Sequence, residues 1–232
     1  MKTESNQIPS FINKWFEEIQ SVNIRDAIQD QSRAAVFSSD VIIGFLSSGN
    51  LSSERVGKLA KPVSGFFEKA YWYGIRNFVL LQDAHHQDTP EFKAFPPHCL
   101  AETEESDTIP ELNSLAFSQL FTVIEKNSLD PALGTNFEEW LNEHGHINTA
   151  IVVGNCTDLC VYQLAMYLRL RANVLDFQDY RVIVPVNLIE TFDIPEDSAK
   201  KSGAMAHPGD FFHQVFLYHM ALNNIEIVKE II

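Results

Sequence analysis

Cys160 follows a short apolar run and a polar turn, Ile151-Val-Val-Gly-Asn-Cys-Thr-Asp-Leu, and an apolar-periodic segment begins directly after it. This order predicts a buried strand, a tight turn and then a helix. A thiol at the amino end of a helix lies among unpaired N–H groups and near the positive end of the helix dipole, which favour the thiolate. Cys160 is therefore a candidate nucleophile. The alternative is a small apolar residue in a core helix.

Three other chemically useful side chains stand at the ends of predicted strands: Asp40, Asp83 and Lys126. In open parallel sheets, ligands bind outside the carboxyl ends of the strands, so these groups would meet Cys160 at one edge. There, Asp40 could take the thiol proton and Lys126 could hold the thiolate. The N–H groups of the turn at residues 155–160 could form an oxyanion hole. Each group also has an ordinary alternative, because Asp often ends strands and Lys is usually solvated.

The segment after the second of these strands contains residue types that bind metals. Asp83-Ala-His85 places a carboxylate and an imidazole on the same side of an extended chain, and Glu91 and His98 follow. Such side chains are ligands of zinc, iron or manganese at neutral pH. An Asp-x-His pair also arises by chance, so the argument rests on all four residues occurring in one segment.

Strands and helices alternate over residues 34–232, which predicts one α/β domain with a mostly parallel sheet and right-handed crossovers. The predicted strands cover residues 34–41, 77–82, 119–125, 149–153, 180–186 and 225–228. The predicted helices cover residues 52–75, 137–144, 159–170 and 210–222. The irregular segment from about 84 to 112 is much longer than a usual connection, which indicates a functional loop.

Residues 1–33 are predicted to form a helical N-terminal extension. Apolar residues recur there at three- and four-residue steps from Phe11 to Val22, as in an amphipathic helix. The apolar face of this helix must be covered either by the domain itself or by another subunit. Packing on the same chain is the ordinary expectation.

The composition excludes several classes of partner. The formal charge of −14 argues against nucleic acid, whose phosphates would be repelled. No apolar run approaches the roughly 18 residues needed to span a membrane, and no basic flank with an apolar block marks a secretory signal. Three cysteines are too few for a disulfide framework, so a reducing cytoplasm is the expected location.

Several motifs follow one another in the order Ser39-Asp40-Val-Ile-Ile-Gly-Phe45, Asp83-Ala-His-His, Phe95-Pro-Pro-His-Cys-Leu-Ala-Glu, Glu125-Lys126, Val153-Gly-Asn-Cys-Thr-Asp-Leu-Cys-Val161 and Ala206-His-Pro. With these motifs the chain resembles the isochorismatase-like cysteine hydrolase superfamily, and within it the plant-type nicotinamidases. The resemblance runs from about residue 34 to the C-terminus. It implies a three-layer α/β/α domain around a mostly parallel six-stranded sheet, preceded by the helical extension at residues 1–33.

The resemblance also implies roles for particular residues. Asp40, Lys126 and Cys160 match the catalytic triad of the superfamily. A non-proline cis peptide bond is implied between Asn155 and Cys156, and the N–H groups of Cys156 and Cys160 would form the oxyanion hole. The remaining thiol, Cys99, and the side chain of Cys156 match positions without a catalytic role.

A metal site and a substrate pocket are implied in the same way. Asp83, His85 and His98 match the family's metal ligands, and Glu91 matches a fourth ligand of some members. The divalent metal, with zinc as the first choice and iron or manganese as alternatives, holds the pyridine nitrogen of the substrate there. The rings of two residues would stack on nicotinamide, namely Phe45 and Phe95.

The expected activity is hydrolysis of nicotinamide to nicotinate and ammonia through a thioester on Cys160. The segment Leu129-Asp-Pro-Ala-Leu-Gly-Thr135 lacks the aromatic residue with which many nicotinamidases close the pocket. An N-carbamoyl or ureido compound or another small amide is therefore an alternative substrate, and isochorismate hydrolysis is a further one. A non-catalytic ligand- or partner-binding protein is the alternative from a different class. The resemblance also implies a homo-oligomer, a dimer or a tetramer.

Overall fold

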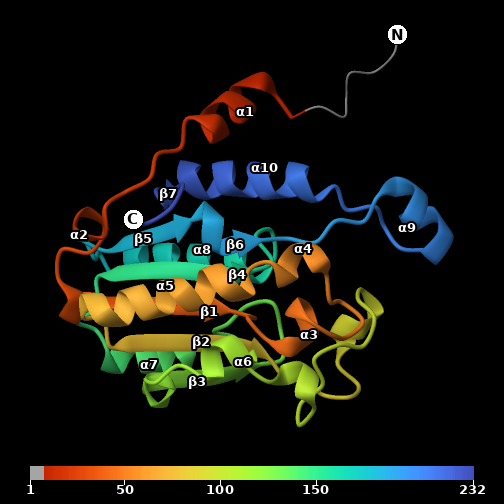
Figure 1. The fold of residues 1–232 in the computed structure, drawn as a ribbon, viewed down its shortest axis with the longest axis horizontal. Coiled ribbons are helices and arrows are strands. Elements are labelled where there is room, and N and C mark those ends of the chain that lie inside the picture. Colours follow the sequence, from red (N-terminus) through yellow and green to blue (C-terminus); the bar gives the residue numbers. More distant parts are fainter. Residues whose placement is uncertain (1–7) are drawn as a thin grey trace.

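The structure is a computed structural model that describes residues 8–232, apart from the side chain of Ser202 (Figure 1). Seven strands in the described part of the chain form one sheet, in the order β3-β2-β1-β4-β5-β7, with β6 pairing with β4. All strand pairs in this sheet are parallel. The strands are β1 (Ala34–Ser39), β2 (Asn77–Asp83), β3 (Phe121–Lys126), β4 (Thr149–Asn155), β5 (Arg181–Pro185), β6 (Ile189–Glu190) and β7 (Glu226–Val228). The predicted α/β class is confirmed.

The six predicted strands are all present, and β6 is an additional one. It pairs with the end of β4, where Gly154 lies opposite Ile189 and Asn155 lies opposite Glu190. A strand of two residues has no alternation of apolar and polar positions that the sequence could reveal. It extends the central strand β4 at the edge where Cys160 is predicted.

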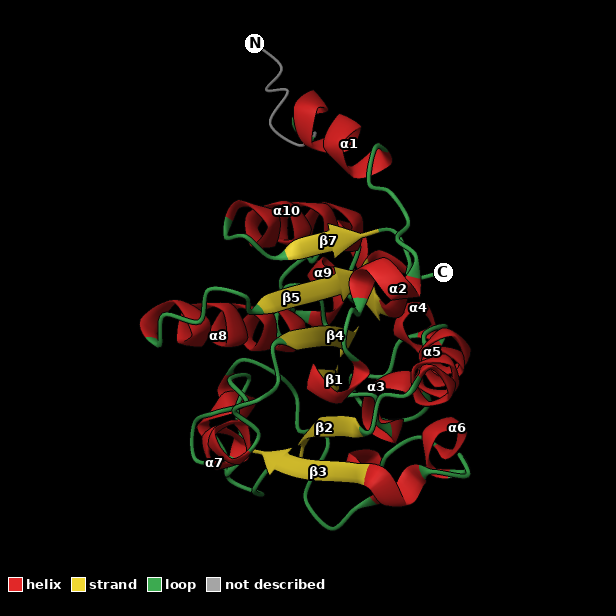
Figure 2. Ribbon diagram, turned by 90° about the vertical axis from the view of Figure 1, so that its left-hand side faces the viewer, coloured by secondary structure: helices red, strands yellow, loops and turns green. Residues whose placement is uncertain are grey.

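Helices cover both faces of the sheet, which gives three layers (Figure 2). Successive residues of a strand point to opposite faces, so Val36 joins one core cluster while Ala35 and Phe37 join the other. The first cluster contains residues of α5 (Ala60–Tyr73), and the second contains residues of α7 (Phe137–Glu143), α8 (Cys160–Val174) and α10 (Gly209–Leu222). Burial on both faces explains why the central strands read as continuous apolar runs rather than as alternating patterns.

The helix predicted over residues 52–75 is divided in two, α4 (Glu54–Gly57) and α5. At the break, a Cβ on Gly57 would lie 2.5 Å from the carbonyl oxygen of Leu46, so the backbone passes too close for another residue. The other short helices are α3 (Ile43–Leu46), α6 (Pro110–Asn113) and α9 (Glu196–Ser202). The segment predicted to be irregular contains α6 and two 3-10 helices, η2 (Pro90–Lys93) and η3 (Glu104–Ser106). The 3-10 helices outside this segment are η1 (Gln31–Arg33), η4 (Ser118–Leu120) and η5 (Val186–Leu188).

The N-terminal helix is shorter than predicted, and residues 1–7 of the predicted extension lie outside the described residues. The structure has α1 (Ser10–Glu17) and α2 (Ile24–Ala27), and Val22 between them forms a parallel bridge with Ile231. Backbone hydrogen bonds to the C-terminal segment therefore replace helical ones at Val22. The apolar side of α1 packs on α10 of the same chain, with Phe11 and Trp15 against Tyr218. No helix within residues 8–232 is both long and apolar enough to cross a membrane.

Candidate active site

The carboxyl ends of four neighbouring strands, β3, β2, β1 and β4, place the predicted residues side by side. Asp83 is opposite Lys126 in the register of β2 and β3, and Asp40 directly follows β1. Cys160 is the first residue of α8, after the turn that follows β4. The chain order reverses between β1 and β4, because β2 and β3 lie on one side and β5 on the other. Crevices at such switch points are where open α/β sheets bind their ligands.

Lys126 lies at the centre of this group. Its Nζ is 3.0 Å from Oδ2 of Asp40 and 3.6 Å from Sγ of Cys160, and it also donates a short hydrogen bond to Oδ1 of Asp83. Carboxylate oxygens of the two aspartates and the thiol sulfur all lie within 4.8 Å of one another. All four residues are buried. The ammonium group already supplies a positive charge here, so a metal ion would be repelled from this half of the site.

Burial and charge set the protonation of the group. Burial and the neighbouring Asp83 raise the pKa of Asp40 to about 6, although Lys126 opposes the shift. Burial lowers the pKa of Lys126, but the two carboxylates outweigh that effect and hold it well above its usual value. Burial raises the pKa of the Cys160 thiol well above its usual value, against the pull of Lys126. The resting site therefore holds a neutral thiol, and not the thiolate expected at a helix terminus, because burial outweighs the helix dipole and Lys126. Beside it is a carboxylate that can accept its proton.

The turn between β4 and α8 has the predicted cis peptide bond between Asn155 and Cys156. At the end of β4, a Cβ on Gly154 would lie 2.0 Å from the carbonyl oxygen of Ser39, so only glycine fits there. Among the hydrogen bonds of the described residues, none has the N–H of Cys156 or of Cys160 as its donor. Two such unpaired N–H groups beside a thiol are what an oxyanion hole requires.

Asp40 is held in an uncommon backbone conformation by this turn. Its φ of 53° lies in the left-handed region, which Asp tolerates better than most residues. The Asn155 side chain donates to the carbonyl oxygen of Asp40 at 2.6 Å, and the N–H of Asp83 donates to its Oδ1 at 2.8 Å. Contacts to both its backbone and its side chain thus fix the orientation of the Asp40 carboxylate. Asn155 was predicted for its backbone, and its side-chain role had no signal in the sequence.

Three of the four predicted metal ligands converge next to Lys126. Ligand atoms of Asp83, His85 and His98 all lie within 4.8 Å of one another. Nε2 of His85 is 3.5 Å from Oδ2 of Asp83, and Nε2 of His98 is 3.9 Å from the same oxygen. The fourth residue, Glu91, brings its Oε1 to 3.7 Å from Nε2 of His85. Asp83 therefore contacts Lys126 through one carboxylate oxygen and faces the histidines with the other.

The hydrogen bonds around these residues fit a cation. Nδ1 of His85 lies 3.1 Å from Oδ1 of Asn127, and Nδ1 of His98 lies 2.8 Å from the carbonyl oxygen of Pro96. Oxygens accept hydrogen bonds, so each Nδ1 carries the proton and each Nε2 presents its lone pair to the cluster. Nε2 of His85 and Oε1 of Glu91 are buried without a hydrogen-bond partner among the described residues. Electron-rich atoms so close together repel one another unless a proton or a metal ion lies between them.

Aromatic rings enclose this cluster. Phe45 is buried, and its ring lies 5.5 Å from that of His98, while the half-buried Phe95 lies 6.2 Å from the same ring. Both predicted aromatic residues thus lie beside the cluster of Asp83, His85 and His98. Phe92, which the sequence did not single out, lies 5.5 Å from His85 and 5.6 Å from His98. Asn127 was also missed, although its place directly after Lys126 was a usable signal.

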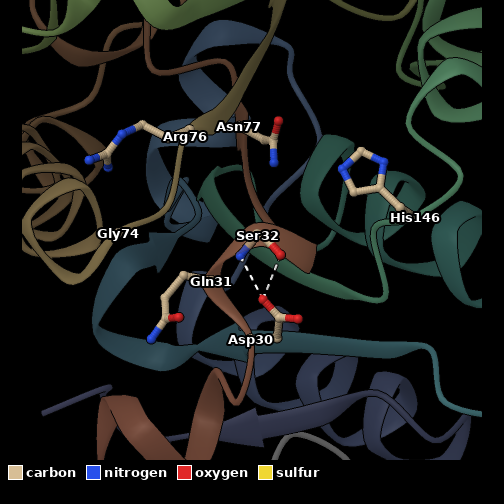
Figure 3. Close-up of a pocket in the computed structure, with 7 residues that line it drawn as sticks. All are labelled: Asp30, Gln31, Ser32, Gly74, Arg76, Asn77 and His146. Carbon is tan, nitrogen blue, oxygen red and sulfur yellow. Dashed lines mark hydrogen bonds between the residues drawn. The ribbon is translucent and has the colours of Figure 1, made fainter.

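A separate surface pocket lies at the other end of the strands, near the amino ends of β1 and β2 (Figure 3). Asp30 in this pocket is bonded to the N–H and the hydroxyl of Ser32. The guanidinium of Arg76 donates to backbone carbonyl oxygens of its own segment. The pocket has no thiol, and its acidic and basic groups are already paired locally. The candidate active site is therefore the edge that holds Cys160.

Comparison with known proteins gives a family and a fold. The family model described as isochorismatase domain matches residues 34–208. Nicotinamidase 1 of Arabidopsis thaliana is 31% identical over 212 residues, which are 83% of this chain and 84% of that protein. The N-carbamoylsarcosine amidase of Thermoplasma acidophilum has a TM-score of 0.63 at 22% identity, covering 85% of this chain and 96% of that chain. The pyrazinamidase of Pyrococcus horikoshii in complex with zinc has a TM-score of 0.63 at 18% identity, covering 85% and 99%. These two structures show the fold alone.

Proposed function

The chain belongs to the isochorismatase family of hydrolases, and we propose that it hydrolyses nicotinamide to nicotinate and ammonia. The observation that carries the proposal is the convergence of Asp40, Lys126 and Cys160 at one buried edge of the sheet. The neighbouring cluster of Asp83 and His98 and the ring of Phe45 support a flat, nitrogen-containing aromatic substrate. The Arabidopsis relative, named a nicotinamidase, supports the same substrate.

In the proposed mechanism, Asp40 takes the proton of Cys160 as Sγ attacks the carboxamide carbon. The oxygen of the resulting tetrahedral intermediate accepts hydrogen bonds from the N–H groups of Cys156 and Cys160, each typically worth about 3 kcal/mol. The C–N bond then breaks, and the leaving nitrogen takes the proton from Asp40 and departs as ammonia. Water attacks the thioester while Asp40 accepts one of its protons. The C–S bond then breaks, Asp40 returns this proton to Sγ of Cys160, and the acid leaves and ionises to nicotinate in solution. Lys126 stays charged throughout and offsets the negative charge of its neighbours.

We propose that Asp83, His85 and His98 hold a divalent metal, with Glu91 as a fourth ligand, and zinc is the first choice for this donor set. When bound, the metal would supply a Lewis acid for the ring nitrogen of nicotinamide. The rings of Phe45 and Phe95 would exclude water and hold the pyridine ring beside the thiol. Support for the metal comes from the buried, unpartnered Nε2 of His85 and from the zinc complex of the Pyrococcus relative.

The substrate assignment is tested by ammonia release from a panel of amides, with metal analysis of the same sample. We expect the highest kcat/KM with nicotinamide, because a pyridine nitrogen can meet the metal cluster while the carboxamide meets Cys160. Benzamide, which has the same shape without the ring nitrogen, is the matched comparison. It should react at least about 100-fold more slowly, because it loses one well-made polar contact. Equal rates for the two amides, or a preference for an N-carbamoyl amino acid, would contradict the assignment.

Metal binding is tested by substitution of single ligands and measurement of metal content and affinity. His98→Ala should weaken zinc binding by more than about 100-fold, because loss of a mere supporting contact already costs about 10–100-fold. Asn127→Ala should weaken zinc binding by about 10–100-fold, since Asn127 orients His85. His146→Ala is the control, because His146 is an exposed histidine in the pocket at the other end of the sheet. If His98→Ala retained its metal as firmly as His146→Ala, the proposed site would be wrong.

An amidase acting on an N-carbamoyl compound is the second candidate. It is favoured by the likeness in fold to the Thermoplasma amidase. It is also favoured by Leu133, which is 67% exposed in the loop where many nicotinamidases have an aromatic residue. The cluster of Asp83, His85 and His98 supports nicotinamide over this candidate, because an N-carbamoyl group has no ring nitrogen to bind a metal held there.

A further inference from the structure

A second buried polar cluster lies behind the turn that precedes Cys160. Asp158 in this turn is 7% exposed, and both of its carboxylate oxygens have partners. The hydroxyl of Thr191 donates to Oδ1, and Nε2 of His207 lies 2.8 Å from Oδ2. Thr191 directly follows β6 and His207 lies two residues before α10, so the carboxylate joins the turn to two distant segments. Neither partner has a part in the mechanism above.

The ring of His207 is held by contacts on all sides. Its Nδ1 lies 2.9 Å from the carbonyl oxygen of Phe192, and its Nε2 lies 2.8 Å from the carboxylate of Asp158. The imidazole is stacked between Phe192 and Phe212, with ring centroids 3.8 and 4.5 Å away. A hydrogen bond to an ionised carboxylate is roughly twice as strong as one between neutral groups.

The residue before Asp158 is anchored as well. The N–H of Thr157 donates to the carbonyl oxygen of Glu190 at 3.0 Å, and its hydroxyl lies 2.8 Å from Nδ1 of His213. Both anchored residues stand between Cys156 and the amino end of α8. Within the described part of the chain, the two N–H groups of the proposed oxyanion hole have no hydrogen-bond partner that would fix their direction. Their directions are therefore set by the anchored residues between them.

We propose that Asp158 is a positioning residue for the oxyanion hole. Held by Thr191 and His207, it orients the turn so that the N–H groups of Cys156 and Cys160 point to one oxygen atom. The inference rests on the proposed acyl-transfer chemistry of Cys160, but not on nicotinamide as the substrate. Breaking the cluster should therefore remove stabilisation of the oxyanion and leave the reactivity of the thiol itself in place.

Two reagents separate these properties. Acylation by p-nitrophenyl acetate builds a tetrahedral oxyanion, whereas iodoacetamide alkylates a thiol by direct displacement and builds none. Thr191→Val and His207→Gln should each slow acylation about 10- to 100-fold, and the upper value is the rate loss expected when one oxyanion donor is removed. The rate of alkylation should change less than about 2-fold. Ammonia release should fall in kcat by a similar factor with KM little changed. Cys160→Ala gives the blank for both reagents.

The matched control is Thr149→Val. Thr149 is a buried threonine at the other end of β4, and its hydroxyl also donates to a side-chain oxygen, that of Asn148, at 3.2 Å. This change should leave both reactions unaltered. Thr191→Ser keeps the hydroxyl and should restore acylation to near the wild-type rate. Should Thr191→Val fail to fold, His207→Gln carries the same comparison.

Two results would overturn the inference. One is acylation in Thr191→Val and His207→Gln as fast as in Thr149→Val. The other is an equal decline of acylation and alkylation, because that would mean a general loss of structure at Cys160. A wild-type protein that is acylated by the ester but releases no ammonia from nicotinamide would instead overturn the proposed substrate and leave this inference standing.

Discussion

Cys160→Ala should abolish ammonia release, with a loss in kcat of at least about 10⁴-fold, as for removal of a nucleophile in other covalent hydrolases. No other described thiol can replace it, because among the described cysteines only Cys160 has a hydrogen bond to Lys126, and Cys99 and Cys156 have none to it. The measurement is steady-state ammonia release, together with the urea midpoint of unfolding. Alanine is close in size to the thiol residue, so the midpoint should change little.

Cys156→Ala is the matched control for this prediction. Cys156 is also buried and lies in the same turn, but its proposed role belongs to the backbone N–H. This variant should keep its activity within a few-fold of the wild type, since alanine preserves that N–H. A large loss in Cys156→Ala, or substantial turnover by Cys160→Ala, would show that the nucleophile has been assigned to the wrong cysteine.

Lys126→Met should lower the free energy of unfolding by about 3–5 kcal/mol and remove activity. Lys126 is 2% exposed, and its ammonium group pairs with two carboxylates, those of Asp40 and Asp83. Without the ammonium group, two neighbouring negative charges stay buried with no cation between them, and one must take up a proton or be exposed. The measurement is urea unfolding followed by circular dichroism, with the midpoint and slope fitted separately.

Two further variants make the cause of this loss testable. Lys58→Met is the control, because Lys58 is an exposed lysine and its loss should cost less than about 0.5 kcal/mol. Adding Asp40→Asn to Lys126→Met removes one of the two charges and should recover part of the stability. If the double variant were no more stable than Lys126→Met, repulsion between buried carboxylates would not be the reason for the loss.

Much of the site could be predicted because a parallel sheet brings strand ends together. Each apolar run ends at a definite residue, so Asp40, Asp83 and Lys126 could be assigned to one edge before the strand order was known. The structure then adds which groups are neighbours. The register of β2 and β3 puts Asp83 opposite Lys126, and that pairing links the candidate triad to the candidate metal ligands.

The remaining parts depend on contacts between segments that are far apart in the chain. Asp40 and Asn155 are separated by 115 residues, and Asp158 and His207 by 49, yet each pair is joined by a hydrogen bond. No local periodicity records such a contact, because it arises only when the layers pack. The helix break at Gly57 and the strand β6 likewise depend on contacts with other segments, the first with Leu46 and the second with the end of β4.

By itself, the sequence determined the α/β class, the strands of the sheet and the identity of the chemically competent side chains. It did so because apolar periodicity and strand ends are local properties of the chain. Only the tertiary structure decided how Asp83 divides its two oxygens between Lys126 and the histidines, and how the turn before Cys160 is held. Those features depend on distances of a few ångströms between side chains from different layers, which packing alone sets.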